Sequence, residues 1–321
     1  NVSIKRILSH RIFAKNVLKY IKKRKKPDVI YCVVPSLDVA HLVTKYANKN
    51  QIKVIIDVQD LWPEAFKMVI NIPVVSNLLF YPMQIKANMI YKAADEIIAV
   101  SQTYVDRAIK VNKKCNQGHC IFLGLELSKF DLYISERTQL NKPINEIWIV
   151  YIGTLGYSYD LISVIEAIKI VKDNGIHNIK FIVMGDGPLR EKFQNYARDL
   201  NINADFMGKL DYKEMVKVLN SCDIAVNPIV KNSAASIINK HADYLAAGLP
   251  IVNTQESLEF RNLLEKNNAG LNCVNNNPKD LADKLLMLCK DNLLRESMGQ
   301  NSRKLAEEKF DRLKTYKEII K

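Results

Sequence analysis

Short apolar runs alternate with amphipathic segments along almost the whole of this chain. The runs are continuous and rich in β-branched residues, as in Ile147–Ile152 and Ile224–Asn227, which is typical of parallel strands buried on both faces. The segments between them, such as residues 161–174, carry apolar residues at helical spacing. The pattern predicts an α/β fold with doubly wound parallel sheets, which bind ligands outside the carboxyl ends of their strands.

The predicted strands cover residues 29–34, 54–57, 96–100, 120–123, 147–152, 180–184, 205–207, 224–227 and 250–254. The predicted helices include residues 39–48, 74–91, 161–174, 189–201, 212–221, 278–292 and 294–309. A length of 321 residues suits two domains rather than one. The polar, turn-rich stretch 131–146 is the expected linker, so we predict domains at 1–140 and 141–309, with a tail at 310–321 packing at their junction.

Positive charge is concentrated at the N-terminal end of the chain. The net charge is +13, and residues 22–26 are an unbroken run of Lys and Arg. Such a surface attracts phosphate-rich partners, whether anionic lipid, nucleic acid or phosphorylated substrates, although a solvated helix face explains the run equally well. The apolar segment 74–91 suits either a membrane surface or a packed helix.

Cysteine and histidine patterns exclude several function classes. The six cysteines lack the spacing of a metal site or a disulfide framework, and the five histidines have no Ser or Cys partners for a hydrolase triad. No signal peptide or membrane-spanning run is evident, so a cytoplasmic location is expected. The chain begins at Asn1 inside a basic helix, from which we expect further residues upstream.

Two glycine-rich turns follow predicted strands. Gly153-Thr154-Leu155-Gly156 follows one apolar run, and Gly185-Asp186-Gly187-Pro188 follows the next. Free amides at the start of a helix favour anions, so each turn could receive phosphate, although an ordinary strand-to-helix turn has the same composition.

Lys240 and Asp243 precede a clear helix stop. A helix starting near Ser236 and ending at Gly248 would place both side chains on adjacent turns. Lysine suits a phosphate, and a carboxylate accepts hydrogen bonds from ribose or sugar hydroxyls. The alternative is an exposed helical ion pair.

An acidic loop in the first half offers a second cluster. It reads Gln59-Asp60-Leu61-Trp62-Pro63-Glu64 and follows a buried strand. Asp60 or Glu64 could act as a base or hold acceptor hydroxyls, and Trp62 could stack on a sugar. A helix cap and a buried aromatic residue would explain them without catalysis.

These motifs, in this order and spacing, resemble the retaining glycosyltransferases of the GT-B fold, in the large family four. The resemblance extends from Pro27 to the C-terminus and includes the Asp60-Leu-Trp-Pro loop, Gly185-Asp-Gly-Pro188 and Lys240 to Pro250. It implies two Rossmann-like domains facing a cleft, with the N-terminal one incomplete here. The subgroup with the Asp-Leu-Trp-Pro loop acts in surface polysaccharide assembly, such as capsule or O-antigen.

The resemblance also implies roles for individual residues. Donor binding would involve Gly153, Thr154, Leu155, Gly185, Gly187, Pro188, Lys209, Lys240, Asp243 and Glu259. The acceptor side would involve Gln59, Asp60, Trp62 and Glu64, with Lys240 and Asp60 as the catalytic candidates.

Five positions depart from the family pattern. The first acid of its Glu-x7-Glu pair falls on Ala235, and the second is the shorter Asp243. The Arg and Lys of its diphosphate clamp fall on Thr154 and Tyr159, which leaves Lys240 or Lys209 as the substitute. A histidine of the acceptor loop is replaced by Gln59.

The resemblance implies transfer of a sugar, with retention, from a nucleotide-diphosphate donor to a lipid-linked or growing surface polysaccharide. A UDP-sugar is the expected donor, without a metal or other cofactor. The expected location is the inner face of the cell membrane, held by anionic lipid, and no nucleic acid partner is expected. Two alternatives stay open: a UDP-sugar 2-epimerase of the same fold, and a non-catalytic GT-B fragment that only binds nucleotide or a partner.

Overall fold

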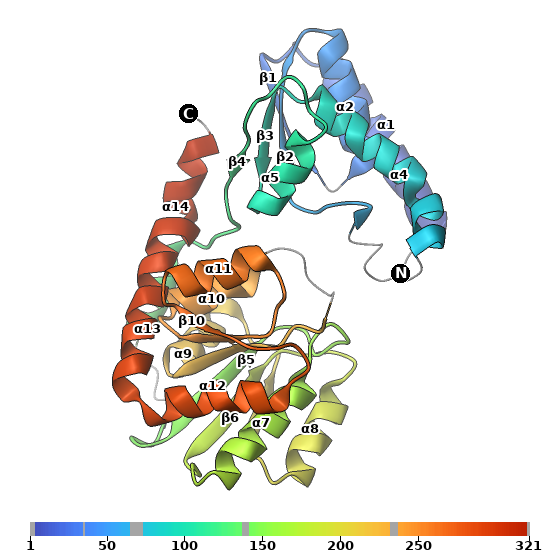
Figure 1. The fold of residues 1–321 in the computed structure, drawn as a ribbon. Helices are drawn as coiled ribbons and strands as arrows, with labels where there is room; N and C mark the ends of the chain where they lie inside the picture. The colour runs from blue at the N-terminus through green and yellow to red at the C-terminus, as the bar shows by residue number, and fades with distance from the viewer. Residues whose placement is uncertain (1–3, 35, 65–72, 137–140, 232–236, 320–321) are drawn as a thin grey trace. The chain divides into compact units, whose positions relative to one another are not determined.

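The computed structural model describes residues 4–34, 36–64, 73–136, 141–231 and 237–319. The chain divides into two compact units, Asn1–Phe122 and Leu123–Lys321, and each is described by itself (Figure 1). The predicted domain boundary at residue 140 lies inside the second unit, beyond helix α6 (Leu127–Ser135). Part of the expected linker at 131–146 is therefore helical.

The first unit contains a parallel sheet in the order β1 (Val29–Val34), β2 (Lys53–Val58), β3 (Glu96–Ala99) and β4 (His119–Cys120). Its helices are α1 (Ile4–Lys22), α2 (Leu37–Lys49), α4 (Pro73–Ala93) and α5 (Gln102–Ile109). β2 lies between β1 and β3, and its residues Val54, Ile56 and Val58 are fully buried. The last strand is shorter than the predicted 120–123, and only two of its residues pair.

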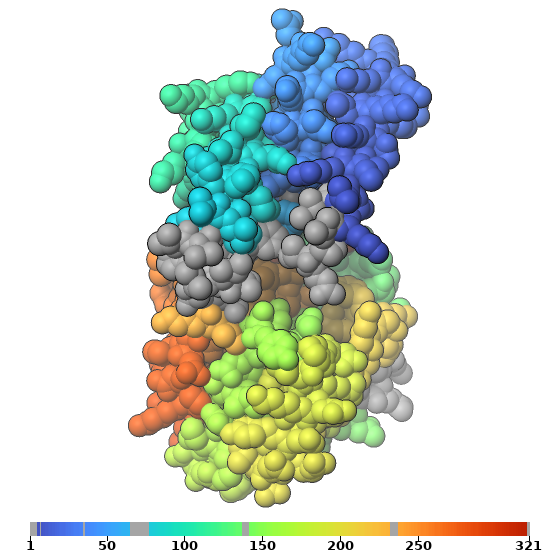
Figure 2. All heavy atoms as spheres, turned by 90° about the vertical axis from the view of Figure 1, so that its right-hand side faces the viewer, coloured from blue at the N-terminus to red at the C-terminus, as the bar shows by residue number. Residues whose placement is uncertain are grey.

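Apolar side chains are exposed on two helices of the first unit. Leu8, Ile12 and Phe13 of α1 are half exposed or more, as are Leu78 and Leu79 of α4. In the space-filling view α1, in dark blue, lies at the surface of this unit (Figure 2). None of the helices in the described ranges is long and apolar enough to cross a membrane.

The second unit contains a six-stranded parallel sheet in the order β10-β9-β8-β5-β6-β7. Its strands are β5 (Ile147–Ile152), β6 (Ile179–Met184), β7 (Ala204–Gly208), β8 (Ile224–Asn227), β9 (Ile251–Asn253) and β10 (Gly270–Asn272). This is the strand order of a dinucleotide-binding fold, reversing between β5 and β8. The predicted doubly wound sheet is confirmed here. β10 was not predicted, because Gly-Leu-Asn lacks the β-branched run that marked the other strands.

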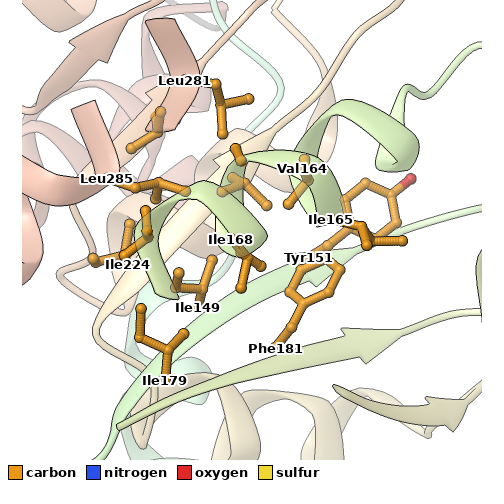
Figure 3. Close-up of a cluster of buried hydrophobic side chains, with 14 of the residues drawn as sticks. Ile149, Tyr151, Val164, Ile165, Ile168, Ile179, Phe181, Ile224, Leu281 and Leu285 are labelled. Atoms are coloured by element: carbon orange, nitrogen blue, oxygen red, sulfur yellow. The ribbon is translucent and has the colours of Figure 1, made fainter. Parts of the chain in front are cut away.

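Helices cover both faces of this sheet. They are α7 (Leu161–Asp173), α8 (Arg190–Asp199), α9 (Tyr212–Asn220), α10 (Asn239–Ala246), α11 (Leu258–Lys266), α12 (Pro278–Lys290) and α13 (Asn292–Leu305). Between α7, α12 and the sheet lies a core that includes Ile149, Ile168, Phe181 and Leu285, all buried (Figure 3). This core fixes the strands whose carboxyl ends carry the glycine-rich turns.

The C-terminal segment packs against the start of the second unit. A single turn of π-helix (Ala306–Phe310) precedes the short helix α14 (Arg312–Thr315). The amide of Leu125 donates to the carbonyl of Phe310, and a side chain at Gly124 would place its Cβ 2.1 Å from that same oxygen. Arg303 also binds the Asp131 carboxylate with two hydrogen bonds of 2.7 Å. Within the second unit, the start of the tail predicted at 310–321 thus contacts residues 124–125, and Arg303 of α13 binds Asp131.

Candidate functional site

The candidate site lies at the carboxyl ends of β5 and β8, where the strand order reverses. Two loops leave the sheet there, residues 153–160 after β5 and 228–231 after β8. Backbone hydrogen bonds join them: the Asp160 amide donates to the Pro228 carbonyl at 2.9 Å, and the Val230 amide donates to the Ser158 carbonyl at 3.1 Å. A crevice at such a reversal is the usual ligand site of an open α/β sheet.

The two glycine-rich turns contact each other closely. A side chain at Gly185 would place its Cβ 1.8 Å from the Gly153 carbonyl oxygen, and one at Gly187 would lie 2.4 Å from that of Leu155. The amides of Gly153 and Leu155 donate to carbonyls of the turn 184–186 at 3.0 and 2.9 Å. Packing of one loop on the other therefore explains both glycines of the second turn.

The amides left to bind an anion differ from those expected. The Gly187 amide is also occupied, by the Asp186 carboxylate at 2.8 Å. The amides of Thr154 and Gly156 donate to no group in the part of the chain that the structure describes. Pro188 does not open the next helix, because α8 begins two residues later. Of the two turns, the first is the better candidate for phosphate.

Lys240 lies directly beside this first turn. Its side chain is buried, and Nζ lies 4.4 Å from the centre of the Tyr151 ring and 4.2 Å from that of Tyr159. A Cβ placed on Gly153 would be 3.8 Å from Nζ. Within the described ranges Nζ has no hydrogen-bond partner, and burial lowers the pKa of the ammonium well below its usual value. The exposed ion pair considered for Lys240 is therefore wrong.

Hydrogen bonds fix the groups around Lys240. We call the Tyr151 ring, the Tyr159 ring and the turn at Gly153 the cage of Lys240. The Tyr151 hydroxyl donates to the Thr154 carbonyl at 2.8 Å, which fastens the turn over the ring. On α10, the Tyr244 hydroxyl accepts from the Ile152 amide at 2.8 Å and donates to the carbonyl of Val226. Tyr244, one turn after Lys240 on α10, thus ties this helix to both strands of the switch point, β5 and β8.

Asp243 lies one turn further along α10 and contacts a different element. Its carboxylate accepts a 2.9 Å hydrogen bond from the Tyr212 hydroxyl at the start of α9. Burial raises the pKa of Asp243 to about 6, and the bond from Tyr212 opposes that rise. Asp243 and Lys240 do not pair with each other, so neither neutralises the charge of the other. The helix begins at Asn239; its expected start at Ser236, and Ala235, lie outside the described residues.

The predicted stop after α10 is confirmed. Gly248 has a φ of 67°, a left-handed conformation that favours glycine. The backbone at Gly248 also packs on α13, where a Cβ on Gly299 would lie 2.4 Å from the Gly248 carbonyl oxygen.

His241, beside Lys240, is fully buried against α11. Its ring stacks on Phe260 with centroids 3.6 Å apart, and Nδ1 accepts a hydrogen bond from the Ile238 amide. That bond assigns the ring proton to Nε2, which has no partner among the described residues. Burial and the neighbouring Lys240 lower the pKa of His241 well below its usual value.

Two further residues predicted to bind the donor lie on other elements. Glu259 is half-buried in the first turn of α11, next to Phe260. Lys209 is exposed just after β7, the edge strand, and forms no ion pair in the described ranges. Lys209 therefore lies at the edge of the sheet, whereas Lys240 is the cation that lies beside the switch point.

A ladder of asparagines at the same edge of the sheet was not predicted. Asn227, Asn253 and Asn272 end three neighbouring strands in register. Nδ2 of Asn227 donates to Oδ1 of Asn253, and Nδ2 of Asn253 donates to Oδ1 of Asn272, each at 2.8 Å. Only the strand register reveals the ladder, because the three residues are far apart in the sequence.

Backbone groups fix the direction of this ladder. Nδ2 of Asn272 donates to the Arg261 carbonyl, and Oδ1 of Asn253 accepts from the Gln255 amide. Neither backbone group can reverse its role, so each amide has one allowed orientation. Oδ1 of Asn227 is consequently left as a buried acceptor without a partner among the described residues.

The residues of the acidic loop in the first unit differ in burial and in hydrogen bonding. Glu64 accepts a 2.6 Å hydrogen bond from Arg107 in an ion pair, so it anchors the loop to α5. Gln59 is half-buried and donates to Asp57 at 2.9 Å, whereas Asp60 is exposed and desolvation raises its pKa. Trp62 is half-buried and precedes Pro63 through a cis peptide bond. A structural role therefore explains Glu64 better than acceptor binding.

No group of three or more His, Cys, Asp or Glu side chains suited to a metal ion occurs within the described ranges.

Relatives of known name share parts of this sequence. An uncharacterised glycosyltransferase of Methanocaldococcus jannaschii is 24% identical over 243 residues, or 75% of this chain and 61% of the relative. A Campylobacter jejuni α-1,4-N-acetyl-D-galactosaminyltransferase, whose name gives an undecaprenol-diphosphate-linked acceptor, is 31% identical over 78 residues, covering 23% of this chain and 22% of that enzyme. The chain thus spans about three fifths of the length of the archaeal relative it matches.

A solved structure and a family profile agree with the fold. Anabaena HepE, crystallised with UDP, superposes with a TM-score of 0.75 at 15% identity, covering 96% of this chain and 80% of HepE. At that identity the likeness shows the fold, which is the GT-B fold of two parallel-sheet units. Residues 134–305, more than half of the chain, match the family described as glycosyl transferases group 1. The match covers the sheet, both glycine-rich turns and α10, and the chain belongs to this family.

Proposed function

We propose that this protein transfers a sugar, with retention, from a nucleotide-diphosphate donor to a lipid-linked or growing surface polysaccharide. A UDP-sugar is the donor we expect. The observation that carries the proposal is the buried side chain of Lys240, whose Nζ has no hydrogen-bond partner among the described residues, beside the glycine-rich turn at the switch point of the second sheet. A diphosphate supplies the negative charge that this position lacks.

The proposed roles follow from the groups that remain available. The amides of Thr154 and Gly156 would donate to phosphate oxygens, and Lys240 would balance their charge as the sugar leaves. Asp243 would accept a hydrogen bond from a ribose hydroxyl. Because this set can stabilise a leaving diphosphate, attack on the same face of the sugar requires no protein nucleophile and no metal.

On the acceptor side, the proposal rests on the exposed part of the loop in the first unit. Asp60 and Gln59 would hold acceptor hydroxyls, and Trp62 would stack on a sugar ring. The undecaprenol-linked acceptor in the name of the Campylobacter relative supports a lipid-linked glycan. The basic, partly apolar surface of α1 and the exposed apolar residues of α4 support attachment to an anionic membrane.

Calorimetric titration with UDP tests the donor site. We expect binding that weakens roughly 10- to 100-fold in Lys240→Met, because a charge-assisted contact is lost. A thermal-shift screen of nucleotide sugars would then identify the donor, and release of UDP with a lipid-linked acceptor would test transfer. Unchanged affinity in the Lys240 variant would sink the proposed site.

The alternatives predict different products from the same material. A binding protein without catalysis would bind UDP but release none from a nucleotide sugar. An epimerase would convert a UDP-sugar to its 2-epimer, and the family match and the glycosyltransferase relatives do not favour it.

A further inference from the structure

The cage around Lys240 is poorly suited to a permanent positive charge. Nζ is closed off from solvent, and it lies beside the rings of Tyr151 and Tyr159 and the glycine-rich turn at Gly153. Ring faces attract a cation, but they replace only part of the hydration that burial removes. In the described part of the chain no carboxylate forms an ion pair with Nζ.

The titratable groups around Lys240 do not provide a counter-charge. Tyr151 belongs to β5 and Tyr159 to the following loop, and burial raises the pKa of both phenols, which keeps them neutral. Asp160, next to Tyr159, hydrogen-bonds Ser163 at the start of α7. On α10 itself, Asp243 accepts from Tyr212, and Tyr244 is a buried neutral phenol.

His241 is the remaining titratable neighbour, and it cannot help either. A positive charge on Lys240 and burial both disfavour its protonation, so it is neutral at physiological pH. The ammonium form of Lys240 would therefore be both unsolvated and unpaired.

We propose that Lys240 is an uncharged amine in the free protein and takes up a proton when a nucleotide diphosphate binds. The inference rests on the proposed donor site. The entering diphosphate places negative charge at the turn beside Nζ, which raises the affinity of the amine for a proton. The acid form of the buffer gives up the proton, which adds to the lone pair of Nζ and returns to the buffer when the nucleotide leaves; no bond of the nucleotide forms or breaks.

Proton uptake makes donor binding depend on pH in a defined direction. UDP binding weakens as the pH rises from the pKa of free Lys240 towards that of complexed Lys240, because over this range the complex holds a proton that the free protein does not.

Calorimetry of the whole chain measures the proton directly. UDP is titrated at about pH 8, where its terminal phosphate, with a pKa of about 6, is already ionised. The titration is run in HEPES and in Tris, which differ in ionisation enthalpy. We expect an observed enthalpy that differs between the buffers by an amount corresponding to nearly one proton taken up for each UDP bound.

Two variants assign the proton. Lys240→Met should still bind UDP, more weakly by roughly 10- to 100-fold, and should take up no proton. His241→Gln should take up the same amount as the unaltered protein.

The outcomes distinguish proton uptake by Lys240 from the donor site itself. UDP binding without buffer dependence would overturn the inference and leave the donor site standing. Uptake that survives in Lys240→Met, or disappears in His241→Gln, would also overturn it, since another group would be the proton acceptor. Failure of the unaltered protein to bind UDP would overturn the donor site and the inference together.

Discussion

Lys240 and Asp243 lie one turn apart on α10, and burial opposes charge on both of them. Neither relieves the other, because Asp243 bonds Tyr212 and Lys240 lies between two aromatic rings. Residues held against their preferred protonation state are a common feature of binding and catalytic sites. Burial of the charged forms of Lys240 and Asp243 lowers the stability of the fold, which is a feature that binding sites share.

The first prediction concerns the stability cost of Asp243. Its pKa of about 6 in the folded protein exceeds the value of about 3.9 in an unfolded chain, so folding favours the protonated form. The contribution to stability is complete at low pH and is lost as the pH rises through about 6. Asp243→Asn should therefore stabilise the protein by about 1–2 kcal/mol at pH near 8 and by little at pH near 4.

Urea unfolding at the two pH values measures this difference, and UDP titration supplies its counterpart. The more stable Asp243→Asn protein should bind UDP more weakly at pH near 8, because an amide replaces the charged acceptor. An equal change in stability at both pH values would show that folding does not raise the pKa of the Asp243 carboxyl.

The sequence could identify residues such as Lys240 and Asp243 by type and spacing but could not describe their surroundings. The rings around Lys240 come from β5 and from a loop paired with residues 228–230, and that pairing is not local. The partner of Asp243 lies 31 positions away on α9. The same limit applied to Glu64, whose ion pair with Arg107 spans 43 positions.

Two glycines in turns of the second unit carry the second prediction: Gly185 follows β6, and Gly175 follows α7. Gly185 and Gly175 both have positive φ, 149° and 89°, but only Gly185 faces another backbone. At Gly175 a Cβ would meet nothing within 4 Å. Gly185→Ala should destabilise the protein by about 3 kcal/mol or more, whereas Gly175→Ala should cost only about 1–2 kcal/mol.

Thermal and urea unfolding of the two alanine variants distinguish crowding from backbone strain. The pair is matched because both substitutions add one methyl group at a left-handed position. An equal loss of stability in both variants would mean that backbone strain alone explains the effect. It would also mean that the close contact between Gly185 and Gly153 does not contribute to stability.

Strands and helices with strong patterns were predicted well. The runs at 147–152 and 224–227 matched the observed strands, because a buried parallel strand is recorded locally in its apolar residues. The run at 29–34 also matched a strand, but the expected burial on both faces was wrong there, since β1 is an edge strand and Val29, Tyr31 and Val33 are exposed. Short or polar elements were not: β10 has three residues, and α6 occupies part of the expected linker. These elements form because of tertiary contacts that no local window contains.

At the scale of the whole molecule, the exposed surface of α1 and its basic extension carry the third prediction. We expect the protein to bind vesicles containing phosphatidylglycerol at low salt and to be released at high salt, since charges separated by water are screened. Reversing two charges, as in Lys22→Glu with Lys23→Glu, should weaken binding roughly tenfold or more.

Sedimentation with vesicles measures this binding, and phosphatidylcholine vesicles provide the control. Equal binding to both vesicle types would indicate attachment through the apolar residues alone. Absence of sedimentation with anionic vesicles at low salt would remove the membrane from the proposal without affecting the donor site.

The fixed direction of the asparagine ladder has a consequence for how this sequence can diverge. Asn272 accepts a hydrogen bond from Asn253, and Asn253 accepts one from Asn227, so a change at Asn272 removes one link of the ladder, while the Gln255 amide still fixes the orientation of Asn253. The three positions are therefore linked through shared side-chain hydrogen bonds. Among homologues, the three positions should change together, and a lineage that replaces one asparagine should show compensation at the other two.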